Sequence, residues 1–213
     1  MNILFEDSHI LVVEKPAGIA TQAGKVTEKD MVSEVNNYLR KADAKSPAFL
    51  IHRLDKPVRG ILLFAKTKQA AAELNRQITE DGFVKKYKAL VEGGVSPSSA
   101  VLENYIYKDG NKAVIIEKDA QKPDQKSDVK FAKLEYSVIE TKDTNSLLDI
   151  RLYTGRFQQI RCQLAYIGHP IVGDTQYGST TPYEKRKAIG LIAYSLSFIH
   201  PITNKEVHFE ISE

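Results

Sequence analysis

Cysteine is scarce in this sequence, because Cys162 is the only one among 213 residues. One thiol cannot form an internal disulfide and cannot by itself build the thiolate site of a zinc finger. Long hydrophobic runs are also missing: none approaches the roughly 20 residues of a membrane helix, and no basic leader precedes an apolar block at the start. We therefore exclude disulfide scaffolds and zinc fingers, and we expect a cytoplasmic protein without membrane contact.

Several signatures of metal and nucleotide chemistry are absent as well. The patterns G-x-x-x-x-G-K, G-x-G-x-x-G and G-x-S-x-G do not occur, which leaves a phosphate-binding loop, a dinucleotide fold and an esterase elbow without support. The five histidines stand at 9, 52, 169, 200 and 208, and no two have the spacing of a zinc-binding helix. These absences leave metal and nucleotide chemistry with little support.

Charge of one sign is not abundant, since 30 basic and 27 acidic residues give a net charge of +3. Its distribution is uneven. Residues 51–100 hold nine basic and five acidic side chains, and residues 151–213 hold seven and five. A basic face assembled from these two stretches would suit nucleic acid. Ordinary surface scatter is the alternative on charge alone.

What is present indicates a folded domain, with 42% hydrophobic and 27% charged residues. Strand patterns outnumber helix patterns, and turn signals between them indicate hairpins, so we expect an α+β fold with a largely antiparallel sheet in one domain, 1–213. An exposed loop is expected at 118–128. Helices are predicted at about 30–40, 67–80 and 157–167, and strands at 3–5, 10–13, 87–91, 101–107, 113–116, 131–140, 147–153, 191–199 and 207–211.

The segment HRLDKPVRG, residues 52–60, combines polar groups with an adjoining apolar run. Asp55 stands among the cations Arg53, Lys56 and Arg59. Nearby positive charge keeps a carboxylate ionised even when it is partly buried, as a nucleophile or base at neutral pH requires. A satisfied cluster of salt bridges at the entry to a strand is the competing interpretation.

A second polar segment, TGRFQQIR at 154–161, leads into the last predicted helix. Amides at a helix start with Arg156 beside them indicate a phosphate site. Arg161 lies further along the helix, where its side chain either extends to solvent or pairs with a buried carboxylate. Another segment, Lys85-Lys86-Tyr87-Lys88, interleaves an aromatic ring with cations, as nucleic-acid surfaces do, but it also suits a solvated strand edge.

At His52-Arg53-Leu54-Asp55 the sequence resembles the RluA-type family of RNA pseudouridine synthases, whose signature is HRLD followed by a short variable stretch and a glycine. The resemblance covers nearly the whole chain from residue 3 and is weakest from 94 to about 145. Four further segments match the family's motifs in the correct order, namely ILVVEKPAGIAT, KKYKALVEG, TGRFQQIRCQLAYIGHPIVGDTQYG and AYSLSFIHP.

The resemblance implies a pseudouridine synthase fold, with a mixed, mainly antiparallel sheet, flanking helices and a catalytic cleft. It implies an isomerase that converts a uridine in ribosomal or transfer RNA to pseudouridine without a cofactor. Asp55 is then the catalytic carboxylate, acting as nucleophile or base. Arg161 is expected to form a salt bridge with Asp55, and Tyr87 to stack on the uracil and accept the proton at C5.

The same resemblance suggests how RNA is held. The target base must leave its stack to be reached, and Arg53 is expected to occupy the gap that it leaves. Leu54 and Ile160 are candidate walls of the uracil pocket. We expect a monomer that lacks the small N-terminal RNA-binding domain of many relatives, so that the catalytic domain itself contacts RNA.

Three residues depart from the family pattern. Val58-Arg59 replaces the Thr-Ser of many relatives, and Gln158 replaces a histidine. These changes affect the expected substrate more than the expected reaction. Two other functions stay open: an RNA-binding or ribosome-assembly protein that has lost turnover, and a hydrolase that uses Asp55 on a substrate other than RNA.

Overall fold

The computed structural model describes residues 1–24, 28–41, 47–80, 82–116, 128–184 and 187–212. Most internal contacts fall within two compact units. The first unit comprises Met1–Lys85, Arg186–Ala188 and Ile192–Glu213, and the second comprises Lys86–Lys185 and Ile189–Leu191. The C-terminal part of the chain thus returns to the unit in which the chain begins.

The first unit is built on a mixed sheet. Its strands are β1 (Asn2–Glu6), β2 (Ile10–Lys15), β3 (Phe49–Leu50), β4 (Arg59–Ala65), β10 (Leu191–Ile199) and β11 (Glu206–Glu210). The path runs β1-β2-β4-β10, with β3 on β4 and β11 on β10. Only β4 and β10 are parallel among the pairs described for this unit.

The parallel pair requires the motif glycine, Gly60. It lies opposite Ala193 in the register, its φ is +151°, and a Cβ there would lie 2.5 Å from the backbone oxygen of Ala193. Only glycine permits so close an approach of two backbones. The glycine of HRLDKPVRG therefore has a structural role, because it brings β4 against β10 directly after the polar segment.

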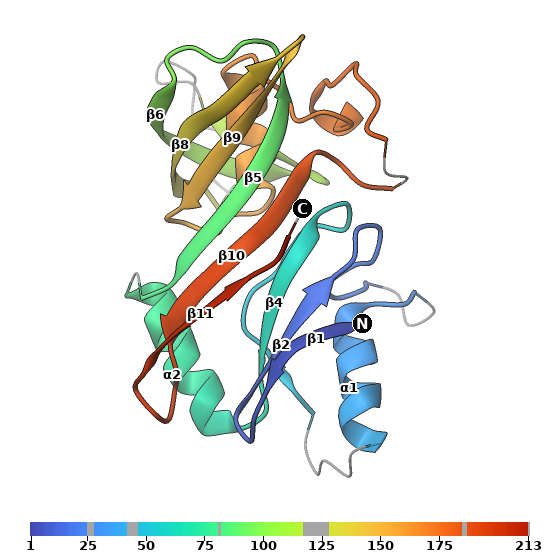
Figure 1. Cartoon of the computed structure of the whole chain (residues 1–213), viewed down its shortest axis with the longest axis vertical. Coiled ribbons are helices and arrows are strands. Elements are labelled where there is room, and N and C mark those ends of the chain that lie inside the picture. Colours follow the sequence, from blue (N-terminus) through green and yellow to red (C-terminus); the bar gives the residue numbers. More distant parts are fainter. Residues whose placement is uncertain (25–27, 42–46, 81, 117–127, 185–186, 213) are drawn as a thin grey trace. The chain divides into compact units, whose positions relative to one another are not determined.

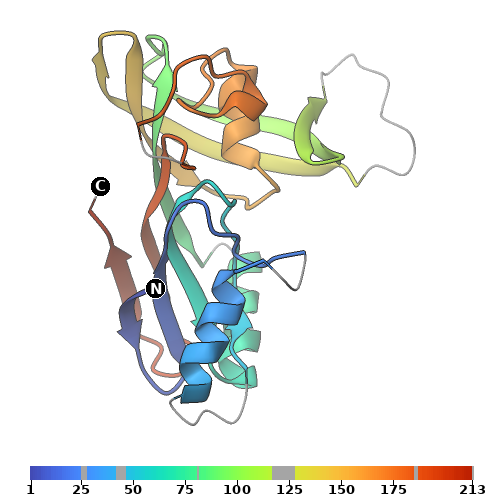
Figure 2. The same cartoon turned by 90° about the vertical axis from the view of Figure 1, so that its right-hand side faces the viewer.

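Two helices cover the same side of this sheet (Figure 2), α1 (Met31–Lys41) and α2 (Lys68–Thr79). Asp30 begins α1, since its carboxylate accepts the amide of Ser33 at 2.7 Å. Thr67 caps α2 by accepting the amide of Ala70 at 3.2 Å. Both predicted helices are confirmed at these starts, although residue 27, an expected capping residue, lies outside the described part.

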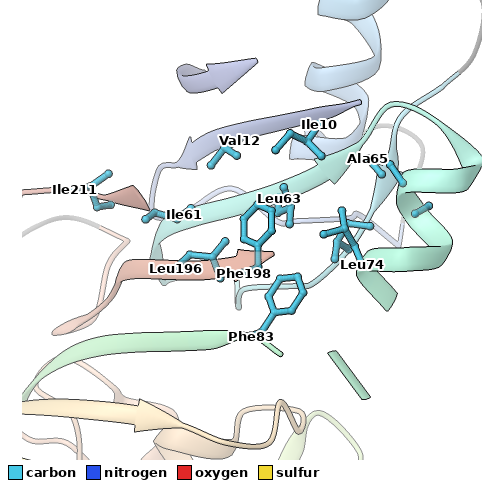
Figure 3. Close-up of a cluster of buried hydrophobic side chains, with 13 residues drawn as sticks. Ile10, Val12, Ile61, Leu63, Ala65, Leu74, Phe83, Leu196, Phe198 and Ile211 are labelled. Carbon is cyan, nitrogen blue, oxygen red and sulfur yellow. The ribbon is translucent and has the colours of Figure 1, made fainter. Parts of the chain in front are cut away.

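The core of the first unit joins β2, β4, β10 and α2 (Figure 3). Phe83 stacks on Phe198 with ring centroids 5.3 Å apart, and Leu74 of α2 is fully buried beside them. Burial of such side chains stabilises the fold by about 1.5–3 kcal/mol each. The buried apolar residues of β4 follow the segment HRLDKPVRG directly and anchor it to the core.

Within the second unit the strand order is β5-β9-β8-β6-β7. The pairs β6·β7, β6·β8 and β8·β9 are antiparallel, and Gly110-Asn111 forms the predicted turn between β6 and β7. Figure 1 shows these strands. The elements are β5 (Val84–Glu92), β6 (Ser99–Asp109), β7 (Lys112–Ile116), β8 (Lys130–Lys142), β9 (Asn145–Leu152), α3 (Gln159–Tyr166) and the 3-10 helix η1 (Thr175–Tyr177).

Helix α3 packs on β6 and β7 and starts later than the sequence pattern predicted. The prediction placed its start at Phe157. The backbone of Gln158 is left-handed, with φ +48°, so the helix can begin only after this residue. The predicted stop is confirmed, because Gly168 has φ +86° and the amide of His169 donates to the carbonyl of Leu164 at 3.0 Å.

The α+β class with a mixed, mainly antiparallel sheet is confirmed. Residues 118–127 of the expected loop lie outside the described part, and the single catalytic domain stays a prediction. Within the described ranges, no helix is both long and apolar enough to cross a membrane.

Glu92, the last residue of β5, holds residues 179–181, which follow the 3-10 helix η1 in the second unit. Glu92 accepts hydrogen bonds from the hydroxyl of Ser179 at 2.7 Å and from the amides of Thr180 and Thr181 at 2.8 and 2.7 Å. Burial acts to raise the pKa of Glu92, but these hydrogen bonds outweigh it and lower the pKa to about 2. The ionised form is therefore the one the fold stabilises.

We expect Glu92→Gln to lower the free energy of unfolding at pH 7 by about 1–3 kcal/mol, since charge-assisted hydrogen bonds are lost. The native pKa lies below the ordinary 4.5, so the contribution of Glu92 is complete above that pH and is lost as pH falls toward 2. The difference in free energy of unfolding between wild type and Glu92→Gln, measured by urea titration, should shrink as the pH falls from 4.5 toward 2. Glu140→Gln, at an exposed site on β8, is the control; a difference that stays constant with pH would contradict the prediction.

Candidate active site

Asp55 lies in the loop between β3 and β4, in the first unit. The loop is held to the loop after β2 by reciprocal hydrogen bonds: the amide of Leu54 donates to Thr21 Oγ1 at 3.1 Å, and that hydroxyl donates to the carbonyl of Leu54 at 2.7 Å. The amide of Gly18 donates to the carbonyl of Lys56 at 2.8 Å. Two loops far apart in sequence thus fix the backbone on both sides of Asp55.

A buried lysine joins the same two loops. Lys15 ends β2 with no exposed surface. Its Nζ donates to the carbonyls of Pro16, Ile19 and Lys56 at 3.0, 2.8 and 3.2 Å. These three bonds use the full donor capacity of an ammonium group. Lys15 therefore acts as a cross-link between the end of β2 and the loop that carries Asp55.

Lys15 is also coupled to Asp55 by charge. Burial lowers the pKa of Lys15 to about 8, and the negative charge of Asp55 opposes that shift. Lys15 is thus mostly protonated at neutral pH. The same attraction favours the ionised form of Asp55, as a nucleophile or base requires.

The sequence prediction placed three cations of the motif itself around Asp55. Two of them have other carboxylates as partners: Lys56 pairs with Glu28 at 2.5 Å, and Arg59 with Glu14 at 2.5 Å. The placement of the motif cations around Asp55 stays a prediction, and the structure adds Lys15, whose charge interacts with that of Asp55. The period-2 pattern of β2 held the missed signal, since it puts this lysine on the face of buried Leu11 and Val13.

The other residues of HRLD differ in exposure. Arg53 is exposed, so its guanidinium is accessible to a ligand, whereas Leu54 is buried. The Nε2 atom of His52 is inaccessible and has no hydrogen-bond partner among the described residues. Burial first, and then the charge of Lys85, lower the pKa of His52 to about 3. His52 is therefore neutral at physiological pH and does not balance the charge of Asp55.

The remaining predicted site residues belong to the second unit. Tyr87 of β5 and Ile160 and Arg161 of α3 are all buried. Arg161 forms a bidentate pair with buried Asp174, with Nε and Nη2 at 2.6 and 2.8 Å from the carboxylate oxygens. Of the two outcomes that the sequence left open for Arg161, pairing with a buried carboxylate is thus confirmed. Its salt bridge to Asp55 stays a prediction.

Further contacts fix the arginine. Its Nη2 donates to Gln176 Oε1 at 2.8 Å, and its guanidinium carbon lies 5.0 Å from the ring centroid of Tyr177. The hydroxyl of Tyr177 donates to Gln158 Oε1 at 2.7 Å, and Gln158 Nε2 contacts Gln176 at 3.4 Å. Gln158, which replaces the histidine of the family pattern, therefore belongs to the network that orients Arg161.

The expected phosphate site at the start of α3 is largely occupied by the protein itself. The amide of Arg156 donates to Gln159 Oε1 at 3.1 Å, and the amide of Gln159 donates to the carbonyl of Arg156 at 3.2 Å. The prediction of free amides is wrong at these two positions, because the side chain of Gln159 and the carbonyl of Arg156 accept from them. The exposed guanidinium of Arg156 remains the group that can meet a phosphate.

The predicted site residues are thus divided between the two units: Arg53, Leu54 and Asp55 belong to the first, and Tyr87, Arg156, Ile160 and Arg161 to the second. The described residues contain no group of three or more His, Cys, Asp or Glu side chains able to hold a metal ion. What the first unit offers chemically is a carboxylate, Asp55, whose charge interacts with the buried ammonium group of Lys15.

We expect Lys15→Met to lower the free energy of unfolding by about 2 kcal/mol or more, because three buried carbonyls lose their donor. Release of the buried charge offsets only part of this loss. Guanidinium titration at pH 7 measures the effect, with Lys68→Met on the exposed start of α2 as the matched control. Equal stability of Lys15→Met and wild type would show that these bonds contribute nothing net.

Asp174→Asn should be more costly, about 3–5 kcal/mol, since it leaves the buried guanidinium of Arg161 without its carboxylate. Glu73→Gln breaks the exposed pair with Arg76 on α2 and should change stability by at most about 1 kcal/mol. Both are measured by urea unfolding. Similar values for the two variants would contradict the importance assigned to the buried pair.

Comparisons with known proteins point to one family. Residues 9–166 match the family described as RNA pseudouridylate synthase. The chain is 33% identical to an "uncharacterized RNA pseudouridine synthase" of Aquifex aeolicus, covering 100% of this chain and 69% of that protein. It is 32% identical to the "ribosomal large subunit pseudouridine synthase C" of Buchnera aphidicola, over 97% of this chain and 65% of the relative.

A similar fold is found in a solved structure, "Human RNA Pseudouridylate Synthase Domain Containing 4", with a TM-score of 0.76, 22% identity and coverage of 99% of this chain and 88% of the human one. The chain thus spans about two thirds of the bacterial relatives and nearly all of the human structure. The match over residues 9–166, together with relatives above 30% identity, shows that this chain belongs to the RNA pseudouridylate synthase family, whose members isomerise uridine to pseudouridine in RNA.

Proposed function

We propose that this chain converts a uridine of RNA to pseudouridine with Asp55 as its catalytic carboxylate, and that residues 1–213 act as one catalytic domain. The observation that carries the proposal is the coupling of Asp55 to the buried ammonium group of Lys15. A carboxylate kept ionised on a clamped loop is suited to attack or to proton transfer.

The reaction balances without a cofactor. The bond from ribose C1′ to uracil N1 breaks, the uracil turns, and a bond from C1′ to C5 forms. The proton of C5 leaves to the solvent and N1 gains one, so that substrate and product are isomers. Asp55 acts on the ribose or the base during the first step. Retention of the free uracil requires a closed pocket, for which we propose Leu54 and Ile160 as walls.

The other roles follow the same proposal. Tyr87 stacks on the uracil and accepts the proton from C5. Arg161 forms a salt bridge with Asp55 when the site is assembled, and its orientation by Asp174 supports that role. Arg53 fills the gap left in the RNA by the extruded base, and Arg156 contacts phosphate.

Ribosomal RNA is the substrate that we favour over transfer RNA, because relatives above 30% identity are named ribosomal large subunit pseudouridine synthases C and D. We further propose a cytoplasmic monomer. The single thiol, Cys162, is buried, which suits a reducing compartment.

We expect Asp55→Asn to lower the rate of tritium release from RNA labelled at uridine C5 by at least about a thousandfold. Asp143→Asn is the matched control, because Asp143 is exposed in the turn after β8 and asparagine tolerates its φ of +54°. Thermal unfolding verifies that both variants are folded.

Full activity of Asp55→Asn would refute the proposed mechanism. RNA binding by the wild type without any tritium release would instead favour a binding protein that has lost turnover. A hydrolase acting on other substrates predicts weak RNA association that salt does not change, whereas binding to phosphates falls steeply with salt.

A further inference from the structure

The side chain of Gln176, in the 3-10 helix η1, lies between Arg161 and the turn that joins β6 to β7. Its Oε1 accepts from Arg161 Nη2 at 2.8 Å, and its Nε2 donates to the carbonyl of Asn111 at 2.9 Å. A guanidinium only donates and a carbonyl only accepts, so these partners fix which end of the amide faces each of them. All three residues belong to the second unit. One planar group therefore links Arg161 to the turn.

The hydrogen bonds of Arg161 show what this link adds. Asp174 accepts from Nε and from Nη2, and Gln176 accepts from Nη2 as well. These bonds use three of the five N–H groups of a guanidinium. The salt bridge proposed with Asp55 then uses Nη1. Because the guanidinium is rigid and planar, a tilt at Nη2 also displaces Nη1.

A second contact joins the same hairpin to the arginine. The amide of Ala113 in β7 donates to the hydroxyl of Tyr177 at 2.8 Å, and Lys112 Nζ lies 4.8 Å from the centroid of the Tyr177 ring. The guanidinium carbon of Arg161 lies 5.0 Å from the same centroid. Gln176 and Tyr177, which are consecutive, thus each contact both the hairpin and Arg161. A shift of the β6–β7 turn is carried to the guanidinium through both side chains.

The two polar partners of Arg161 differ in their exposure. Asp174 is 2% exposed, whereas Gln176 is half-buried and its partner in the turn, Asn111, is exposed. Hydrogen bonds near solvent open more readily than those in the core. Asp174 therefore holds the arginine permanently, and the bond to Gln176 is the contact that a change in the turn can alter.

We propose that Gln176 is a positioning residue for the isomerisation: it sets the orientation of Arg161 and makes that orientation depend on the position of the β6–β7 turn. The inference rests on the proposed function, since it takes Arg161 as the partner of Asp55. Asp174 balances the charge of Arg161, and Gln176 directs the guanidinium.

The first test measures tritium release from RNA labelled at uridine C5 with Gln176→Met, which loses both hydrogen bonds. We expect kcat to fall by about tenfold or more, because displacement of a catalytic group by about 1 Å can cost a hundredfold. KM should change by less than about threefold, since the lost interaction acts after binding. Gln69→Met, at an exposed position of α2, is the matched control and should leave kcat unchanged.

Gln176→Glu separates the two bonds of the amide. Glutamate retains an oxygen that accepts from Arg161, but when ionised it cannot donate to the carbonyl of Asn111. If the orientation depends on the turn, kcat stays about fivefold below that of the wild type, the effect of one hydrogen bond.

The turn offers an independent variant. Gly110 has φ +55°, and a Cβ there would meet no atom within 4 Å, so Gly110→Val strains the backbone of the turn without a clash at Cβ. We expect kcat to fall and KM to be retained. Asp143→Val introduces the same strain in the turn between β8 and β9, where φ is +54°, and should leave kcat unchanged.

Hydrogen exchange at the guanidinium tests the orientation without the reaction. In NMR of protein with isotope-labelled arginine, the Nη signals of Arg161 are assigned with Arg161→Lys. Their protons should exchange with solvent about tenfold faster in Gln176→Met than in wild type, since a charge-assisted hydrogen bond is lost.

Unchanged kcat in Gln176→Met that thermal unfolding shows to be folded would overturn the inference. A raised KM with unchanged kcat would also overturn it, because Gln176 would then bind substrate and not orient Arg161. Full kcat in Gln176→Glu or in Gly110→Val would overturn the dependence on the turn. Failure of the proposed function is read separately, as tritium release that Asp55→Asn does not reduce, and exchange at Arg161 stays measurable in that case.

Discussion

The buried ammonium group of Lys15 is the interaction on which the rest of the first unit depends. Removing a cation from water is costly, and the fold offsets this cost with three carbonyl acceptors and the charge of Asp55. The acceptors come from two loops, one directly after β2 and one directly before β4. One side chain therefore holds the loop of Asp55 in place, and its charge attracts the charge of Asp55.

The second unit buries a cation by another route. Arg161 has a full bidentate carboxylate partner in Asp174, supplemented by Gln176 and the ring of Tyr177. Planar guanidinium suits such a fork, whereas the ammonium of Lys15 suits carbonyls arranged around a point. Because Asp174 already balances the charge of Arg161, the arginine is held in one orientation before any substrate arrives. An oriented donor loses less freedom when it binds its target.

Local patterns in the sequence predicted most elements, and long-range contacts account for what they missed. The β10 strand was predicted with its observed bounds, and Thr67 was recognised at the start of α2, because alternation and capping are local signals. The late start of α3 depends on the left-handed Gln158, which is held by Tyr177, 19 residues away. Asp55 was found through its motif, but Lys15 bonds to Lys56 across 41 positions. No local pattern in the sequence predicts such a pairing. The contacts of Asp174 with Arg161 and of Glu92 with Ser179 could not be predicted for the same reason.

The departures from the family pattern in the HRLD loop also have a structural explanation. Val58 is 2% exposed and packs into the core, so a hydroxyl is not needed to hold it. Arg59 pairs through Nε with Glu14 of β2 at 2.5 Å, and Lys15 follows Glu14 directly. Lys15 thus holds the loop of Asp55 at Lys56, and its neighbour Glu14 holds the loop at Arg59. At Val58 and Arg59 this chain uses an apolar contact and an ion pair, which leaves Asp55 on a loop fixed on both sides.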